Sequence, residues 1–190
     1  MGPVFVAFVV FLLAERTIEL GLAERNRRWA MRQGGRESGG SHYPVIVGMH
    51  VLFYFSLIAE RILFRSGWSA AWPFWIALLA LGQAIRVWSI AALGRFWNTR
   101  IIVIPGIAPV RRGPYRFVRH PNYLAVGLEI LSIPMLAGAW RTAAVFSALN
   151  ILIMCIRVPA EERALRDAAA GGLVSLPRFL PKVRLTRRPP

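Results

Sequence analysis

Long apolar runs, separated by short polar and basic stretches, dominate the hydropathy pattern of this chain. The runs occupy residues 4–13, 45–59, 68–85, 123–139 and 142–156. Several approach the roughly 20 residues that a helix needs to cross a bilayer. The pattern predicts an all-α integral membrane protein with about five transmembrane helices, organised as a single domain over residues 1–190.

The first three helices are expected over residues 3–25, 43–64 and 69–93, which together form the N-terminal part (1–93). A Gly- and Ser-rich loop is expected at residues 26–42, between the first two helices. The fourth helix is expected to begin at Pro121, since proline lacks the N–H that the first helical position leaves unpaired.

The segment 94–170 has a different character from the first three helices. It begins with a basic loop that contains a β-like run at residues 101–104, and it continues as a helical hairpin that turns near residues 138–141. A polar helix is expected at its end, over residues 161–170. The remaining residues, 171–190, form a basic tail.

The charge of the chain is strongly basic, with 24 Lys and Arg against 9 Asp and Glu in 190 residues. The basic residues lie after the first, third and fifth expected helices, and cytoplasmic loops carry such an excess. Five helices therefore place the N-terminus outside and the C-terminus in the cytoplasm. Because the arginines lie in short loops between apolar runs, we expect membrane lipids rather than nucleic acid as partners. Three scattered histidines and one cysteine form no metal-type cluster, so no metal is expected.

A polar motif, Arg119-His120-Pro121-Asn122-Tyr123, stands at the start of the fourth expected helix and follows the turn Gly113-Pro114-Tyr115. One interpretation is an interface anchor, because Tyr and Arg are common at membrane surfaces. The other is a binding pocket. A helix N-terminus offers free N–H groups to an anionic ligand, here those of residues 122–124, and the rings of Tyr115 and Tyr123 would pack against a planar group.

Arg157 and Glu161 lie four residues apart and therefore share one face of a helix. They form either an ordinary ion pair or two contacts to one ligand, in which Glu161 accepts hydrogen bonds and Arg157 binds a carboxylate. The neighbouring Glu162 is expected to be a solvated charge. Other charged residues within or near the expected spans are functional candidates, although interhelical pairing is the favoured interpretation. They are Glu15, Arg16, Glu19, Glu60, Arg86 and Glu129.

In this order and spacing, the three elements resemble the isoprenylcysteine carboxyl methyltransferase family. They are Gly113-Pro114-Tyr115, the motif at 119–123 and Arg157-x-x-x-Glu161-Glu162, and the resemblance covers residues 98–166. The N-terminal half resembles the bacterial branch of the family, which includes methyltransferases of long-chain polyketide phenols and pyrones. That second resemblance rests on Arg16-x-x-Glu19-Leu20, Glu24-Arg25-Asn26 and His42-Tyr43-Pro44.

The resemblance implies a pocket for S-adenosylmethionine at the cytoplasmic face, formed by the loop before the fourth helix and by the helix after the fifth span. By position, the cofactor-binding residues would be Val110, Tyr115, His120, Pro121, Asn122, Tyr123 and Glu161. Arg157 would meet the methyl acceptor as a catalytic residue, and His120 is the candidate base for a phenol. Where the family has a glutamine after the third helix, this chain has Arg100.

The implied function is O-methylation of a lipidic acceptor in the bacterial inner membrane. A long-chain phenol or pyrone is favoured over a prenylcysteine carboxylate, which would connect the protein with phenolic lipid biosynthesis. Membrane sterol reductases carry a related Arg-His-Pro-x-Tyr motif, so a nicotinamide-dependent lipid reductase is one alternative, and Arg157 with Glu161 argues against it. A non-enzymatic membrane scaffold is the other.

Overall fold

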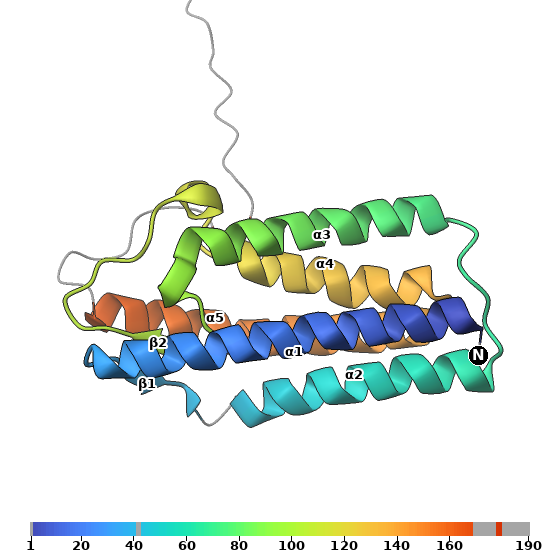
Figure 1. Ribbon diagram of the computed structural model, residues 1–190, viewed down its shortest axis with the longest axis horizontal. Coiled ribbons are helices and arrows are strands. Elements are labelled where there is room, and N and C mark those ends of the chain that lie inside the picture. The colour runs from blue at the N-terminus through green and yellow to red at the C-terminus, as the bar shows by residue number, and fades with distance from the viewer. Residues whose placement is uncertain (1, 41–42, 169–177, 180–190) are drawn as a thin grey trace, which may run out of the picture.

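Five helices lie side by side in an elongated bundle, as the computed structural model shows for residues 2–40, 43–168 and 178–179 (Figure 1). The helices are α1 (Pro3–Arg32), α2 (Tyr43–Leu63), α3 (Trp72–Leu93), α4 (Pro121–Leu136) and α5 (Trp140–Ala168). The predicted all-α architecture is confirmed. The short connections are the 3-10 turns η2 (Gly94–Phe96) and η3 (Gly113–Arg116) and the strands β1 (Arg36–Ser38) and β2 (Ile101–Val103).

Three helices of the described chain are long and apolar enough to cross a membrane: α2, α3 and α5. At about 1.5 Å per residue, the 16 residues of α4 reach only about 24 Å. The middle of α1 carries Glu15, Arg16 and Glu19. The bundle is thus that of an integral membrane protein, whereas the count of five spans stays a prediction.

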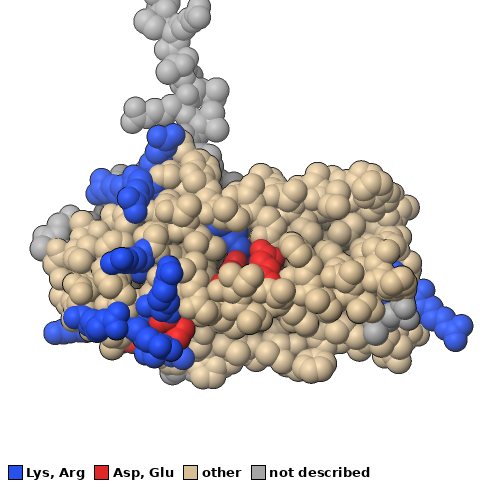
Figure 2. All heavy atoms as spheres, in the orientation of Figure 1, with Lys and Arg blue, Asp and Glu red and all other residues tan. Residues whose placement is uncertain are grey.

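The bundle is apolar on its outside as well as in its core. The core includes Phe53, Leu57 and Phe146, while Phe55 and Ile151 are among many large apolar side chains that are more than half exposed. Figure 2 shows this surface as a broad belt that is free of charged side chains except for one small group of acidic and basic residues near its middle. Such a surface suits lipid, where helices satisfy their own backbone hydrogen bonds and need no polar exterior.

The prediction of a loop at residues 26–42 is wrong for residues 26–32, because α1 continues to Arg32. Glu24 pairs with Arg27 and Arg28 along this extension, and the buried Asn26 amide donates hydrogen bonds to the carbonyls of Gly94 and Trp97. These contacts favour another two turns of helix over a loop. The chain then forms β1, which pairs antiparallel with the β-like run, β2, in the register Glu37 opposite Ile102.

The other boundaries agree closely with the prediction. The structure starts α4 at Pro121 and turns at Gly138, whose φ is +74°. The polar helix expected after the fifth span is the continuation of α5, which runs without a break through Pro159. Most of the basic tail lies outside the described residues.

Interhelical pairing, the favoured interpretation of the intramembrane charges, is confirmed. Glu129 of α4 accepts hydrogen bonds from Arg86 of α3, whose Nε lies 2.6 Å from Oε1, and from Arg16 of α1 at 2.6 Å. Glu60 of α2 accepts the backbone N–H groups of Arg141 and Thr142 at the start of α5, at 3.1 and 2.7 Å. A carboxylate at a helix N-terminus also interacts favourably with the helix dipole.

Candidate functional site

A cavity of about 780 Å³ opens at the end of the bundle where β1 and β2 lie. Its walls come from α1, α2, the segment between α3 and α4, the start of α4 and the second half of α5. Pockets for small ligands measure about 300–1,000 Å³, so a cavity of this size can hold a ligand with room for part of a second.

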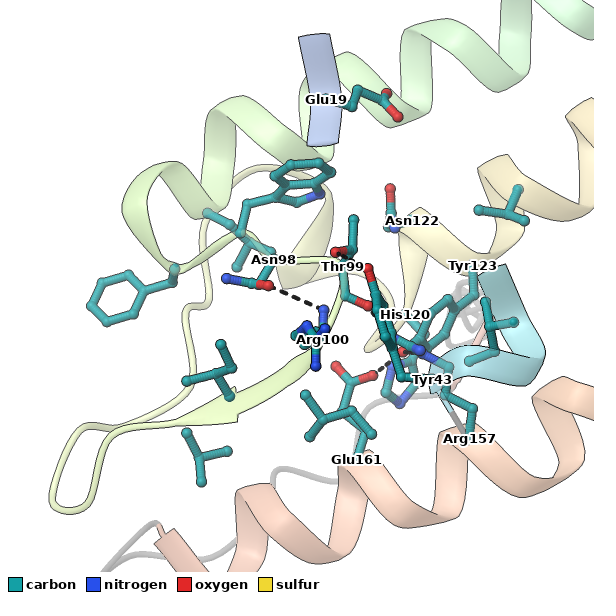
Figure 3. A pocket seen from close by; sticks show the side chains of 18 of the residues that line it. Glu19, Tyr43, Asn98, Thr99, Arg100, His120, Asn122, Tyr123, Arg157 and Glu161 are labelled. Carbon is teal, nitrogen blue, oxygen red and sulfur yellow. Dashed lines mark hydrogen bonds between the residues drawn. The ribbon is translucent and has the colours of Figure 1, made fainter. Parts of the chain in front are cut away.

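The phenol of Tyr123 joins the two α5 residues that the sequence singled out. Arg157 Nε donates to the Tyr123 hydroxyl at 2.7 Å, and that hydroxyl donates to Glu161 Oε2 (Figure 3). Arg157 and Glu161 are therefore connected through Tyr123, and no direct ion pair between them is present. Arg157 is buried, and hydrogen bonds to the Tyr123 hydroxyl and to the Thr99 carbonyl determine the orientation of its guanidinium.

The segment after α3 forms a second wall through Thr99 and Arg100. The Thr99 carbonyl accepts a hydrogen bond from Arg157 Nη2 at 2.5 Å, and the Thr99 hydroxyl lies 3.2 Å from the Tyr43 hydroxyl. The guanidinium of Arg100 lies over the Tyr43 ring, 4.0 Å from its centroid, and pairs with Glu37 of β1 at 2.6 Å. The β1–β2 pair thus holds the α3–α4 segment against α2 and α5.

The expectation that Glu162 is a solvated charge is wrong, because its side chain is only 3% exposed. Its carboxylate meets Arg119 at 2.9 Å, His120 Nε2 at 3.2 Å and Arg178 at 2.9 Å. Adjacent helix residues do diverge, but α4 and the chain at Arg178 cover the side of α5 from which Glu162 projects. Glu162 consequently fixes the His120 ring, which stacks on Tyr123 with 5.5 Å between the ring centroids.

The turn at Gly113 requires glycine. Its φ is +58°, and a Cβ there would lie 2.7 Å from Ala92 Cβ and 3.1 Å from Trp88 Nε1 of α3. This close approach to α3 brings η3 over the cavity with Tyr115 among the lining residues. Burial, with the Glu161 carboxylate nearby, raises the pKa of Tyr115, so its phenol stays neutral at physiological pH.

Three residues of the cavity wall have a buried side-chain atom without a hydrogen-bond partner in the described part of the chain: the donors Trp97 Nε1 and Arg119 Nε, and one acceptor. The side-chain oxygen of Asn122 is buried and has no hydrogen-bond partner in the described part of the chain, although Asn122 lines the cavity. Buried acceptors are normally paired, so an unpaired one beside a cavity indicates a place for a ligand donor.

Comparison with known proteins identifies a family whose matching region includes most of these cavity-lining residues. The model of the isoprenylcysteine carboxyl methyltransferase (ICMT) family matches residues 75–167, which include α4, most of α3 and α5, and the cavity wall between α3 and α4. The uncharacterized protein YpbQ of Bacillus subtilis (strain 168) is 40% identical over 163 residues, 86% of this chain and 97% of that protein. The chain belongs to the isoprenylcysteine carboxyl methyltransferase family. Another relative, an uncharacterized protein of Haemophilus influenzae, is 26% identical over 155 residues, 81% of this chain and 90% of that protein.

Membership in the ICMT family supports a membrane methyltransferase. The structure brings the residues expected from the family resemblance to one cavity: Val110, Tyr115, His120, Asn122, Tyr123, Arg157 and Glu161 line it. Pro121 is not among the lining residues; it is fully buried in the first turn of α4. The N–H of Leu124 donates to the His120 carbonyl at 3.4 Å, so it is not available to a ligand as the anion-binding interpretation required.

From the sequence we did not predict that α1 and α2 contribute residues to the cavity. The lining residues include Tyr43, His50 and Tyr54 of α2 and Arg16 and Glu19 of α1. A signal was present: the three α2 residues are spaced by seven and four, which puts polar groups on one face of an otherwise apolar helix.

Proposed function

We propose that this protein is an S-adenosylmethionine-dependent O-methyltransferase that acts on a lipidic acceptor at the cytoplasmic face of the membrane. The observation that carries the proposal is the single cavity in which Tyr115, Asn122, Tyr123, Arg157 and Glu161 meet. Family membership supports the reaction class.

The residues fit the cofactor by their chemistry. S-adenosylmethionine carries a planar base, hydroxyls, an ammonium and a carboxylate, and it supplies an electrophilic methyl group on a sulfonium. The unpaired Asn122 oxygen and the Glu161 carboxylate accept hydrogen bonds, whereas Tyr115 and Tyr123 offer aromatic faces. Arg157 presents a cation beside these groups, where it orients an anionic acceptor and favours phenolate over phenol.

The acceptor's tail has a route to the cavity from the bilayer. Leu13 and Leu20 of α1 and Val47 and Val51 of α2 line the cavity, and all four are between 42% and 53% exposed. A lipid therefore enters sideways between α1 and α2 while its polar head meets the cofactor. Long-chain phenols and pyrones remain the favoured acceptors over a prenylcysteine carboxylate, because the N-terminal half resembles the bacterial branch.

The orientation follows from charge. Figure 2 shows Lys and Arg gathered mainly at the end of the bundle where the cavity opens. Cytoplasmic loops carry such an excess of basic residues, so this end faces the cytoplasm, where S-adenosylmethionine is available. The domain then consists of the N-terminal helices (1–93), the cofactor-binding part (94–170) and the basic tail (171–190).

Calorimetry on the purified protein tests the cofactor. The parent protein is expected to bind S-adenosylmethionine, and Glu161→Ala is expected to weaken binding about 10-fold or more, since it removes a charged hydrogen-bond acceptor. Asp167→Ala is the matched control, because Asp167 is an exposed carboxylate on the same helix outside the cavity. A parent protein that binds no S-adenosylmethionine contradicts the proposal, and thermal protection by NADPH instead indicates a reductase.

A further inference from the structure

His50 of α2 presents an open hydrogen-bond acceptor to the cavity. Its Nδ1 lies 2.8 Å from the carbonyl oxygen of Ile46, one turn earlier in the helix. A carbonyl only accepts, so Nδ1 carries the proton and Nε2 of the neutral ring is the acceptor. Nε2 has no hydrogen-bond partner among the described residues, and the ring lines the cavity.

The helix geometry brings His50 to the depth of the cofactor-binding residues. Arg61 of α2 donates to the Ala137 carbonyl at 2.7 Å, so the outer ends of α2 and α4 lie within reach of one arginine side chain. At about 1.5 Å per residue, His50 lies about 16 Å from Arg61 along α2, and Tyr123 lies about 21 Å from Ala137 along α4. The two lengths differ by about one helical turn, and both His50 and Tyr123 line the cavity.

The other imidazole and the carboxylates in the described cavity wall are each hydrogen-bonded to another side chain. Glu19 pairs with Arg16 and Arg86, and Glu161 accepts from Tyr123. Of the remaining two groups, Glu162 contacts two arginines and the His120 ring, and His120 contacts Glu162 through Nε2. His50 differs from these groups because, among the described residues, no side chain is hydrogen-bonded to its ring.

We propose that His50 is the general base for methyl transfer to a hydroxyl acceptor, an inference that rests on the proposed function. The hydroxyl proton passes to Nε2, and the oxygen's electron pair forms the new bond to the methyl carbon. The electrons of the methyl–sulfur bond stay on sulfur, which becomes a neutral thioether, and the imidazolium then releases its proton to water at the open end of the cavity. A phenol with a pKa of about 10 is mostly protonated at neutral pH, so it needs this step, whereas a carboxylate does not.

The charged groups near His50 come from three other helices: Arg16 of α1, Arg86 of α3 and Glu129 of α4. They are paired with one another, so none of them competes for Nε2. Toward the cofactor-binding residues, Tyr43 lies two turns along α2 on the same face, with Ile46 and Val47 between them in the lining. The base is therefore held on a regular helix between an ion-paired cluster and the cofactor-binding wall.

Two acceptors separate this role from a structural one. Pentadecylresorcinol offers a phenol, and N-acetyl-S-farnesylcysteine offers a carboxylate. His50→Gln is expected to lower kcat with the phenol about 100-fold or more at neutral pH, the contribution of a positioned base. This loss in kcat is expected to become smaller as the pH approaches the pKa of the phenol. The rate with the carboxylate acceptor is expected to stay unchanged. Leu52→Ala, an exposed position on α2 outside the cavity, serves as the control.

A second readout does not depend on turnover. In NMR spectra of the protein with isotope-labelled histidine, the His50 Nε2 signal is expected to move when pentadecylresorcinol binds beside S-adenosylhomocysteine. Unchanged phenol methylation by His50→Gln, equal losses with both acceptors, or a parent protein that methylates the carboxylate alone would each overturn the role of His50. If His120→Gln, and not His50→Gln, lowers kcat with the phenol in a pH-dependent way, the general base is His120 instead. Failure of the proposed function is a separate result, since the parent protein then binds no S-adenosylhomocysteine.

Discussion

The ion-paired cluster of Arg16, Glu19, Arg86 and Glu129 allows a sharp test of how this bundle is held together. The side chains of Arg86 and Glu129 are only 4% and 5% exposed, and Arg86 Nε lies 2.6 Å from Glu129 Oε1. Glu129 also accepts from Arg16 at 2.6 Å, so one carboxylate joins α1, α3 and α4. Removing one partner of a buried pair leaves an uncompensated charge, which costs about 3–5 kcal/mol.

Glu129→Leu and Arg86→Met are each expected to destabilise the protein by that amount. For a chain of 150–250 residues, about 1 kcal/mol shifts Tm by about 2–4 °C, so each single variant should melt about 6–20 °C lower. The double variant Arg86→Met/Glu129→Leu is expected to recover most of this loss. It removes one positive and one negative charge together and leaves Arg16 paired with Glu19 at 2.6 Å.

Thermal unfolding in detergent micelles, followed by the fluorescence of the seven tryptophans, measures these shifts. Glu24→Gln is the control, because Glu24 also bonds to two arginines on α1 but its side chain is 39% exposed. Exposed pairs contribute about 0–1 kcal/mol, so its Tm should move little. If the double variant loses as much stability as the two single variants added together, the pairing account of this cluster is refuted.

Two further substitutions test the walls of the cavity. Gly113→Ala is expected to cost about 1–3 kcal/mol and to weaken S-adenosylmethionine binding, because its φ is positive and its Cβ meets Ala92. Gly106→Ala has a φ of +80° but open space around it, so its Tm should fall by less. Tyr123→Phe removes the hydroxyl between Arg157 and Glu161 and should lower cofactor affinity about 10-fold or more, as calorimetry would measure. Unchanged affinity in Tyr123→Phe would show that this hydroxyl does not order the site.

Local signals in the sequence were sufficient for most of the fold. The start of α4 at Pro121 follows from the backbone chemistry of proline, and the apolar runs locate the helices because lipid requires them. The extension of α1 to Arg32 could not be predicted in this way. It depends on Asn26 meeting the carbonyls of Gly94 and Trp97, which lie about 70 residues away along the chain.

The same distinction applies to the cavity. Tyr115, Tyr123 and Glu161 could be predicted because they stand in motifs with a recognisable spacing. Glu162 could not, since a charge next to a site residue on a helix is normally solvated, and only the tertiary position of Arg119, His120 and Arg178 shows otherwise.

The charged cluster and the cavity are parts of one arrangement. Arg16, Glu19 and Arg86 line the cavity while they also tie α1 and α3 to α4. The α1 and α2 sides of the cavity carry exposed apolar residues, between which we propose that the acceptor's lipid tail enters. The walls of the cavity must then be rigid enough to keep their positions when the tail enters. Ion pairs between helices supply that rigidity in hydrocarbon, where an unpaired charge is costly. A variant that weakens the cluster is therefore expected to affect lipid acceptors more than S-adenosylmethionine, for which we propose the opposite wall at η3, α4 and α5.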